Sequence, residues 1–100
     1  MRIIKARTLR DYAVKHSDAA SSIVLVVALM RAARWSSMND VLGTFRKAKI
    51  LNAERFRLEI AGNTYRLICA VHFGSSAVYV KFIGTHAEYD AVDALTVSKY

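Results

Sequence analysis

The feature that most restricts the fold is a strict alternation of apolar and charged residues between positions 55 and 60. The apolar members are Phe56, Leu58 and Ile60, and the charged members are Arg55, Arg57 and Glu59. Successive side chains of a β-strand point to opposite faces, whereas a helix repeats about every 3.6 residues. The segment is therefore predicted to be a strand with one buried face.

Two further strands are predicted to follow this one. Gly62-Asn63 and Gly74-Ser75-Ser76 provide turns on either side of a strand over Thr64–Phe73, and a third strand covers Val78–Gly84. We expect Asn63 to adopt a positive φ in the first turn, since Asn-containing turns tolerate that conformation. Three strands joined by short turns predict an antiparallel meander. Its core face is expected to carry Leu67, Cys69, Val71 and Phe73 from the second strand and Val78, Val80 and Phe82 from the third.

The remaining segments predict helices and one short strand. Met1–Lys5 is expected to form the strand, and Thr8 with Asp11 has the spacing of a capping box at a helix start. A second helix is expected from Ser17 or Asp18 to about Arg34, and a short third one after Ser36 or Ser37. Thr85 and Glu88 form another capping box before a last helix that ends near Leu95. The predicted class is α+β: a small antiparallel sheet, two N-terminal helices on one face and a short C-terminal helix.

Composition limits the classes of protein to which the chain can belong. One hundred residues, 54% of them hydrophobic, predict a single folded domain spanning residues 1–100. The single cysteine, Cys69, excludes an intrachain disulfide, and clusters of metal-ligating residues are missing from the sequence, so we expect neither a metal nor a cofactor. The apolar run Ile23–Met30 is too short to span a membrane, and no signal peptide is recognisable at the start of the chain. A cytoplasmic protein is predicted.

A net charge of +7 favours a polyanionic partner. If the helices cover the apolar face of the sheet, the other face carries a cationic and partly aromatic set of side chains: Arg57, Arg66, His72, Tyr79 and Lys81. Like charges on neighbouring strands are unfavourable unless an anion offsets them, which favours binding of nucleic acid. The alternative is an ordinary solvated sheet face.

Two motifs resemble the HigB toxins, which belong to the RelE-like ribonucleases. They are G-N-T-Y-R-L-I at positions 62–68 and V-Y-V-K-F-I-G-T-H-A-E-Y-D at positions 78–90. The resemblance implies a RelE-like fold and a toxin of a type II toxin–antitoxin system. It also implies a metal-independent endoribonuclease (an mRNA interferase) that cleaves messenger RNA, often on translating ribosomes, and a HigA-type helix-turn-helix antitoxin that neutralises it.

The chain departs from this family pattern at two places. Leu58-Glu59-Ile60 stands where the family commonly has Phe-Asn-Ile, so Glu59 either acts as a base or reduces activity. The second helix is also more apolar than is typical of the family. Exposed apolar surface on it would indicate a contact with a partner.

Four residues are candidates for catalysis. Arg66 can hold two phosphate oxygens in its planar fork, although it could instead be a surface arginine paired with Glu59. Lys81 can stabilise the charge of the transition state, or be only a strand-edge lysine. His86, in the first turn of the last helix, suits a base beside a bound phosphate, although a lone histidine is more often structural. Tyr89, one turn later, can orient the phosphate or stack on a base, unless it belongs to the core.

Candidates for RNA binding are Arg57, Asn63, Tyr65 and Tyr79, of which Asn63 and Tyr65 could equally be structural. Two other functions remain compatible with the sequence. One is a non-catalytic RNA- or DNA-binding module that uses the same cationic face. The other is an inactive toxin relic that only binds its antitoxin.

Overall fold

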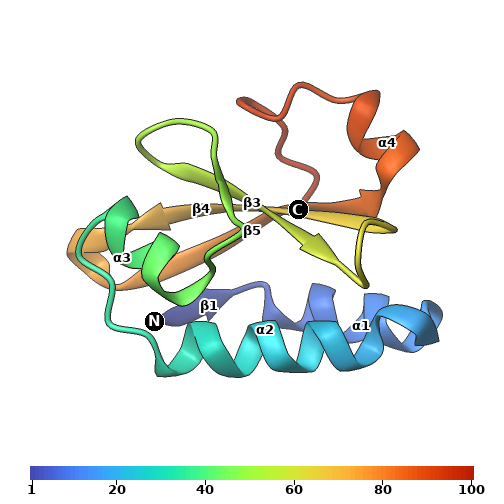
Figure 1. The fold of residues 1–100 in the computed structure, drawn as a ribbon, viewed down its shortest axis with the longest axis horizontal. Coiled ribbons are helices and arrows are strands. Elements are labelled where there is room, and N and C mark those ends of the chain that lie inside the picture. The colour runs from blue at the N-terminus through green and yellow to red at the C-terminus, as the bar shows by residue number, and fades with distance from the viewer.

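The computed structural model describes residues 1–100 and has an α+β architecture, with a five-stranded mixed sheet and four α-helices (Figure 1). The strands lie in the order β1-β5-β4-β3-β2. They are β1 (Arg2–Ile4), β2 (Lys49–Ile50), β3 (Arg55–Ile60), β4 (Tyr65–His72) and β5 (Ala77–Thr85). The expected antiparallel meander is present as β3, β4 and β5.

The prediction of a purely antiparallel sheet was wrong at its edge. Strand β1 pairs with β5 in the parallel direction, with Ile3 opposite Val78, and the backbone N–H of Arg2 donates to the carbonyl of Ser76 at 2.8 Å. Tight turns make successive meander strands antiparallel. Strand β1 is separated from them in the chain by three α-helices, so no turn determines its direction. Strand β2 has no counterpart among the predicted elements, because two residues are too few to show a period.

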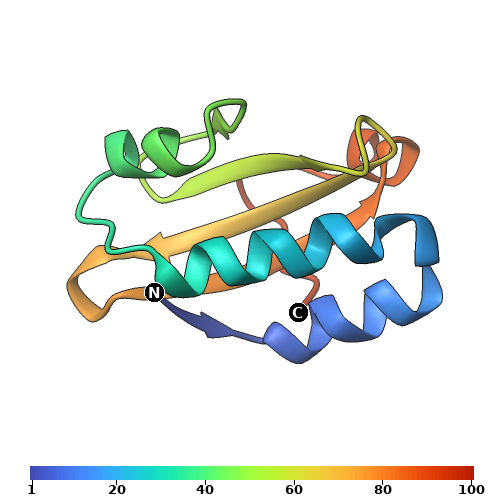
Figure 2. The ribbon, with the colours of Figure 1, turned by 60° about the horizontal axis from the view of Figure 1, so that its bottom comes forward.

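The helices lie on both sides of the sheet. Helices α1 (Ala6–Lys15) and α2 (Ala20–Ala32), joined through a 3-10 turn over Ser17–Ala19, run side by side under one face (Figures 1 and 2). Helix α3 (Met38–Thr44) follows α2 in the chain. The short α4 (His86–Asp90) and the segment after it lie on the other face (Figure 1). None of the helices has the length and apolarity that a membrane crossing requires.

The predicted helix starts were only partly correct. The Thr85–Glu88 capping box is present, but α4 ends at Asp90 rather than near Leu95. Helix α1 begins at Ala6, before Thr8, and has no side-chain cap. Asp11 instead pairs with Arg7 at 3.9 Å, one turn earlier on the same helix.

Two other predicted caps are also used differently. Neither Ser37 nor the residues before α2 cap a helix with a side chain. The Oδ2 atom of Asp40 accepts bonds from the backbone N–H and hydroxyl of Ser36 at 2.8 and 3.0 Å, and these bonds lower the pKa of Asp40. Asp18 accepts a hydrogen bond from Tyr65. Side-chain oxygens with several donors within reach cannot be assigned from spacing alone.

One apolar core lies between the sheet and the helices. Its fully buried members include Leu9 of α1, Met30 of α2, Val41 of α3 and Phe56 of β3. Trp35 is buried as well, and its indole N–H donates to the hydroxyl of Thr44 at 2.9 Å. Cys69 is buried among these residues, and burial raises the pKa of its thiol to about 12. It therefore packs as a small apolar side chain.

A β-bulge changes which residues of β5 face this core. Ile68 of β4 lies opposite Phe82, whereas the next residue, Cys69, lies opposite Val80, so Lys81 is an extra residue in β5. A bulge shifts the alternation by one position. Ile83 therefore joins the core, and Phe82 contacts Tyr89 and Lys99 outside it. Phe82 is buried, as predicted, but on the face opposite the predicted one, because two adjacent apolar residues hide such a shift.

The first turn of the meander differs from the prediction by one position. Positive φ values occur at Ala61 (54°) and Gly62 (67°), and Asn63 is not among the residues with positive φ. Two consecutive positive φ values match the twist of a hairpin. Asn63 contributes through its backbone carbonyl, as described below.

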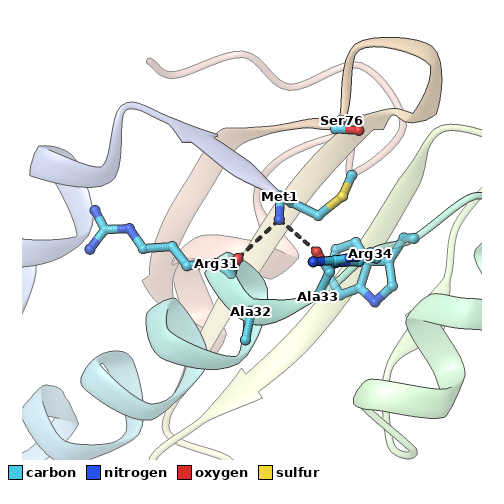
Figure 3. A pocket seen from close by; sticks show the side chains of 7 residues that line it. Met1, Arg31, Ala32, Ala33, Arg34 and Ser76 are labelled. Atoms are coloured by element: carbon cyan, nitrogen blue, oxygen red, sulfur yellow. Dashed lines mark hydrogen bonds between the residues drawn. The ribbon is translucent and has the colours of Figure 1, made fainter.

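The amino group of Met1 closes the end of α2. It donates to the carbonyls of Met30, Arg31 and Ala33 at 3.0, 3.2 and 2.7 Å, and the last two of these bonds are drawn in Figure 3. These carbonyls lack partners within the helix, and the positive group also offsets the helix dipole. A pocket of about 590 Å³ at this place is lined by Met1, Arg31, Ala32, Ala33, Arg34, Trp35 and Ser76. None of the side chains that line this pocket is a candidate for a general base in catalysis.

Candidate functional site

Two arginines and a tyrosine meet on the sheet face opposite α1 and α2. Arg57 extends from β3 and Arg66 from β4, while Tyr89 comes from α4. The guanidinium carbons of Arg57 and Arg66 lie 5.5 and 6.0 Å from the centre of the Tyr89 ring. Together with Glu59 they are called here the arginine–tyrosine cluster. Both guanidinium groups are close enough to the ring for a cation–π interaction.

One carboxylate serves both arginines of this cluster. Glu59 lies directly opposite Arg66 in the sheet register, and its Oε1 atom is 4.0 Å from Arg66 and 3.8 Å from Arg57. The expected juxtaposition of like charges was therefore wrong at this pair, because register places the one acidic residue beside Arg66. The alternative pairing of Arg66 with Glu59 is present. It leaves the cluster with an excess of one positive charge.

The arginines are buried more deeply than surface arginines usually are. The side chain of Arg66 is 6% exposed and that of Arg57 is 18% exposed. One Nη1–H of Arg66 donates to the carbonyl of Asn63 at 3.2 Å, but the Nε–H groups of both arginines are buried without any acceptor. Buried donors without partners are rare in folded proteins. Two of them side by side indicate a place where an anion can supply oxygen atoms.

The start of α4 positions Tyr89 above the sheet. The hydroxyl of Thr85 accepts from the N–H of Glu88 at 3.2 Å, and the Glu88 carboxylate accepts from the N–H of Thr85 at 2.8 Å. These bonds lower the pKa of Glu88. The residue before the cap is Gly84, where a Cβ atom would lie 2.7 Å from the Phe82 ring. Phe82 in turn packs against Tyr89, with 6.4 Å between the ring centres.

His86 lies at the first position of α4 and is half exposed. Its Nδ1 atom is 3.0 Å from the Oδ2 atom of Asp90, one turn later. This contact turns Nδ1 toward the carboxylate, so Nε2 is the ring nitrogen that Asp90 does not occupy. The backbone N–H of His86 donates to Thr64 at 3.1 Å. It is therefore not available to bind phosphate, contrary to the expectation for this helix start.

His86 and Arg66 are both held by the turn between β3 and β4. Arg66 donates to the carbonyl of Asn63, and His86 donates its backbone N–H to the carbonyl of Thr64, the next residue. The structure thus brings Arg57, Arg66 and Tyr89 together and anchors the backbone of His86 to the turn that also holds Arg66. Asn63 takes part through its backbone oxygen.

Lys81 and Tyr79 belong to a second group on the same face. The Nζ atom of Lys81 lies 5.5 Å from the centre of the Tyr79 ring. Both line a shallow hollow of about 310 Å³, here called the Lys81 pocket, whose residues are Glu54, Arg55, Ala70, Val71, His72, Tyr79 and Lys81. His72 accepts from the backbone N–H of Ser75 at 3.2 Å and so caps the following 3-10 turn. The four predicted catalytic residues thus fall into two groups rather than one.

The segment after α4 lies over this face of the sheet (Figure 1), and two residues of the Lys81 pocket, Arg55 and Lys81, form hydrogen bonds with it. The guanidinium of Arg55 donates to the carbonyls of Ala94 and Val97 at 3.2 and 2.7 Å. The N–H of Lys99 donates to the carbonyl of Lys81 at 2.9 Å. These bonds hold the segment over the sheet.

Tyr65 lies on the other side of the sheet. It is buried in the core, and its hydroxyl donates to Asp18 at 2.8 Å, which raises the pKa of Tyr65. His16, stacked on Tyr12 at 4.0 Å, lies 3.5 Å from the same hydroxyl. Burial raises the pKa of Tyr12 to about 12. Tyr65 is thus not part of the arginine–tyrosine cluster, and its contacts are those of a core residue.

Three features of the face were missed in the sequence. Asp90 could have been found, because His86 and Asp90 have the i, i+4 spacing that joins side chains on a helix. The shift of Phe82 to this face and the attachment of Arg55 to carbonyls some 40 positions away have no signal in the sequence. No three His, Cys, Asp or Glu side chains come together as ligands for a metal ion.

Comparison with known families gives one match. The family model HigB_toxin, described as the RelE-like toxic component of a toxin–antitoxin system, matches residues 19–92. This range covers about three quarters of the chain and contains the whole arginine–tyrosine cluster, the Lys81 pocket and α4. A search of curated proteins found no match.

Proposed function

This chain belongs to the HigB family of RelE-like toxins of toxin–antitoxin systems, and from that premise we propose that it is a metal-independent endoribonuclease. Its substrate in this proposal is messenger RNA, bound on translating ribosomes. A HigA-type helix-turn-helix antitoxin neutralises it, and residues 1–100 act as a single cytoplasmic toxin domain. The proposal rests on the family and on the chemistry of the open sheet face.

The observation that carries the proposal is the pair of buried arginines with unpartnered Nε–H groups. A phosphodiester offers oxygen atoms in the geometry that guanidinium groups bind, and bonds between charged groups are stronger than neutral ones. Because Arg57 and Arg66 are largely removed from water, their charges act on a bound phosphate with little screening. In this mechanism they stabilise the additional charge of the transition state.

Proton transfer is assigned to α4. The Nε2 atom of His86 takes the proton of the ribose 2′-hydroxyl, and the 2′-oxygen then forms a bond to phosphorus while the bond to the 5′-oxygen breaks. Tyr89 donates the proton that the leaving 5′-oxygen needs. The orientation of His86 by Asp90 supports its role as the base, since the bond at Nδ1 fixes the tautomer. The products are a 2′,3′-cyclic phosphate and a free 5′-hydroxyl.

Lys81 and Tyr79 bind the RNA beside the cleaved bond. Their group lies on the same face as the arginines but forms no ion pair or cation–π contact with Arg57, Arg66 or Tyr89. We therefore assign Lys81 to the neutralisation of a neighbouring phosphate, and Tyr79 to stacking on a base. Lys81 contributes to binding more than to the chemical step.

Cleavage of messenger RNA by purified protein and translating ribosomes, with EDTA present, tests this proposal. The natural sequence should give discrete cuts. Arg66→Ala and His86→Ala should each lower the rate on the order of 10²–10³-fold, as loss of one transition-state donor or proton carrier does. Lys15→Ala, at an exposed lysine of α1, is the matched control and should cleave normally.

Two other results would overturn the proposal. Retention of RNA without cuts would indicate a non-catalytic RNA-binding module. Tight binding of the antitoxin by a chain that neither cleaves RNA nor arrests growth would indicate an inactive toxin relic.

A further inference from the structure

The outer side of α2 lacks the charged residues that a surface helix normally presents. From Ala19 to Met30 the chain has no charged residue, and the exposed positions of the helix before Arg31 are Ser21, Val24, Leu25, Ala28 and Leu29. Val24 and Leu25 are 66% and 59% exposed. A helix packed on one side only usually has a polar opposite side. The composition of α2 therefore indicates that something covers this side.

Two of these exposed residues, Val24 and Ala28, line a groove between α1 and α2. It has a volume of about 400 Å³ and is lined by Arg10, Ala13, Ile23, Val24, Val27, Ala28 and Arg31. The floor is apolar, and one arginine comes from each helix. Neither Arg10 nor Arg31 forms an ion pair with this chain, whereas Arg7 on the same helix does. The groove thus combines an apolar floor with two free cations.

We infer that this groove binds an amphipathic helix of the antitoxin that has an apolar stripe flanked by acidic residues. The inference rests on the proposed function, because membership of a toxin–antitoxin family supplies the partner. Helices commonly bind through apolar side chains inserted in such grooves, and opposite charges at the rim fix their orientation. Glutamate or aspartate on the antitoxin would pair with Arg10 and Arg31.

Charge argues against a second copy of this chain as the occupant. Each copy carries a net charge of +7, so self-association brings two strongly cationic molecules together. The rim of the groove is cationic too, and α1 and α2 together contain only Asp11 as an acidic residue, which Arg7 already holds. An acidic helix from another protein would supply the carboxylates that pair with Arg10 and Arg31 at the rim.

The position of the groove has a functional consequence. Helices α1 and α2 lie on the sheet face opposite α4 (Figures 1 and 2), so a helix in the groove does not cover the arginine–tyrosine cluster. Groove contacts anchor the antitoxin, and another part of it must reach the RNA face to block cleavage. Variants of the groove should therefore separate antitoxin binding from RNA cleavage.

Calorimetric titration of the full chain with its cognate antitoxin tests the inference. Val24→Glu and Arg31→Glu should each raise the Kd about tenfold or more, since both place a carboxylate against an acidic helix. Lys47→Glu makes the same change of charge as Arg31→Glu at an exposed loop position and should change the Kd less than about twofold. Circular dichroism of each variant checks that the fold is retained.

The cleavage assay distinguishes failure of this inference from failure of the proposed function. Loss of antitoxin affinity in both groove variants supports the inference, whether or not the natural sequence cleaves RNA. Unchanged affinity in both variants overturns the inference while leaving the nuclease proposal intact. A dimer that Val24→Glu dissociates in light scattering, or cosedimentation with anionic vesicles that Val24→Glu abolishes, would overturn it by identifying another occupant.

Discussion

The two faces of the sheet are built from alternate residues of the same strands, yet they differ in the kind of polar group that they bury. On the face under α1 and α2, strand β3 contributes the buried Phe56, and even the polar Tyr65 has a hydrogen-bond partner in Asp18. On the other face, Arg57 and Arg66 are nearly as deeply placed but keep donors without acceptors. On the first face the buried donor without a partner is the neutral hydroxyl of Tyr12, whereas on the second the unpartnered donors belong to two charged guanidinium groups, which a bound anion would satisfy under the proposed function.

Truncation in the first face should have the largest effect on stability. Phe56→Ala removes a fully buried ring and should lower the free energy of unfolding by about 3–5 kcal/mol, through lost burial and the cavity left behind. Urea denaturation measures this change. The control Val14→Ala, at an exposed position of α1, should stay within about 0.5 kcal/mol of the natural sequence. An equally large loss in Arg57→Ala would contradict the division between the faces.

Removal of the ring shared by the two arginines should weaken RNA binding next most strongly. Tyr89→Ala removes the cation–π contacts that hold Arg57 and Arg66 in place. Ordering each freed side chain again when RNA binds costs about 0.5–1.5 kcal/mol, so affinity should fall on the order of tenfold to a hundredfold. Fluorescence anisotropy with a single-stranded RNA measures it.

Tyr89→Phe separates the ring from the hydroxyl. It should keep the affinity, because the ring remains beside both guanidinium groups, but slow single-turnover cleavage if the hydroxyl donates a proton. Weak binding by Tyr89→Phe would show that the hydroxyl, rather than the ring, holds the RNA.

Loss of the α4 cap should have a moderate effect that depends on pH. Thr85→Ala removes the acceptor for the Glu88 N–H and should cost about 1 kcal/mol of stability at neutral pH. Bonds from Thr85 lower the pKa of Glu88 in the folded state, so their stabilisation is present above the unfolded pKa of a glutamate and is lost as pH falls through the lowered folded value.

Thermal unfolding as a function of pH, with Glu88→Gln as the comparison, measures this contribution. The natural sequence should be the more stable of the two at pH 7, and the difference should vanish below the folded pKa of Glu88. A difference that grows toward acid pH would contradict the assignment.

The carboxylate between the arginines should have the smallest effect. Glu59 is partly exposed, so its pairing contributes less than about 1 kcal/mol, and Glu59→Gln should tighten RNA binding a few-fold by freeing Arg57 and Arg66. The rate at saturating RNA decides its other possible role. A rate that falls by about 10²-fold or more would identify Glu59 as the base in place of His86.

The comparison also explains how much the sequence could predict. The alternation in β3 and the Thr85–Glu88 capping box are local patterns, and both appear in the structure. The position of Phe82 on the face opposite the main core and the parallel pairing of β1 could not be predicted, because a bulge and a long-range pairing leave no local signal.

The candidate site shows the same limit. Alternation placed Arg57 and Arg66 on one face, but the sequence did not reveal that register sets Glu59 opposite Arg66 or that Lys81 lies in a separate pocket. For Tyr65 the sequence left packing and RNA contact open, and the structure shows the packing role: Tyr65 lies two residues before Leu67, so alternation places it on the core face. Local patterns identified the charged and aromatic residues of the face, and long-range contacts decided how these residues group.

The salt dependence of RNA affinity tests the central claim most directly. The logarithm of the affinity for single-stranded RNA falls with the logarithm of salt concentration by about 0.7 per phosphate contact. The double variant Arg57→Ala/Arg66→Ala should therefore reduce this slope by about 1.4, whereas Arg10→Ala/Arg31→Ala, on the helix side, should leave it unchanged. An unchanged slope in the first variant, or an equal reduction in the second, would contradict the claim that the buried arginine pair binds RNA phosphate.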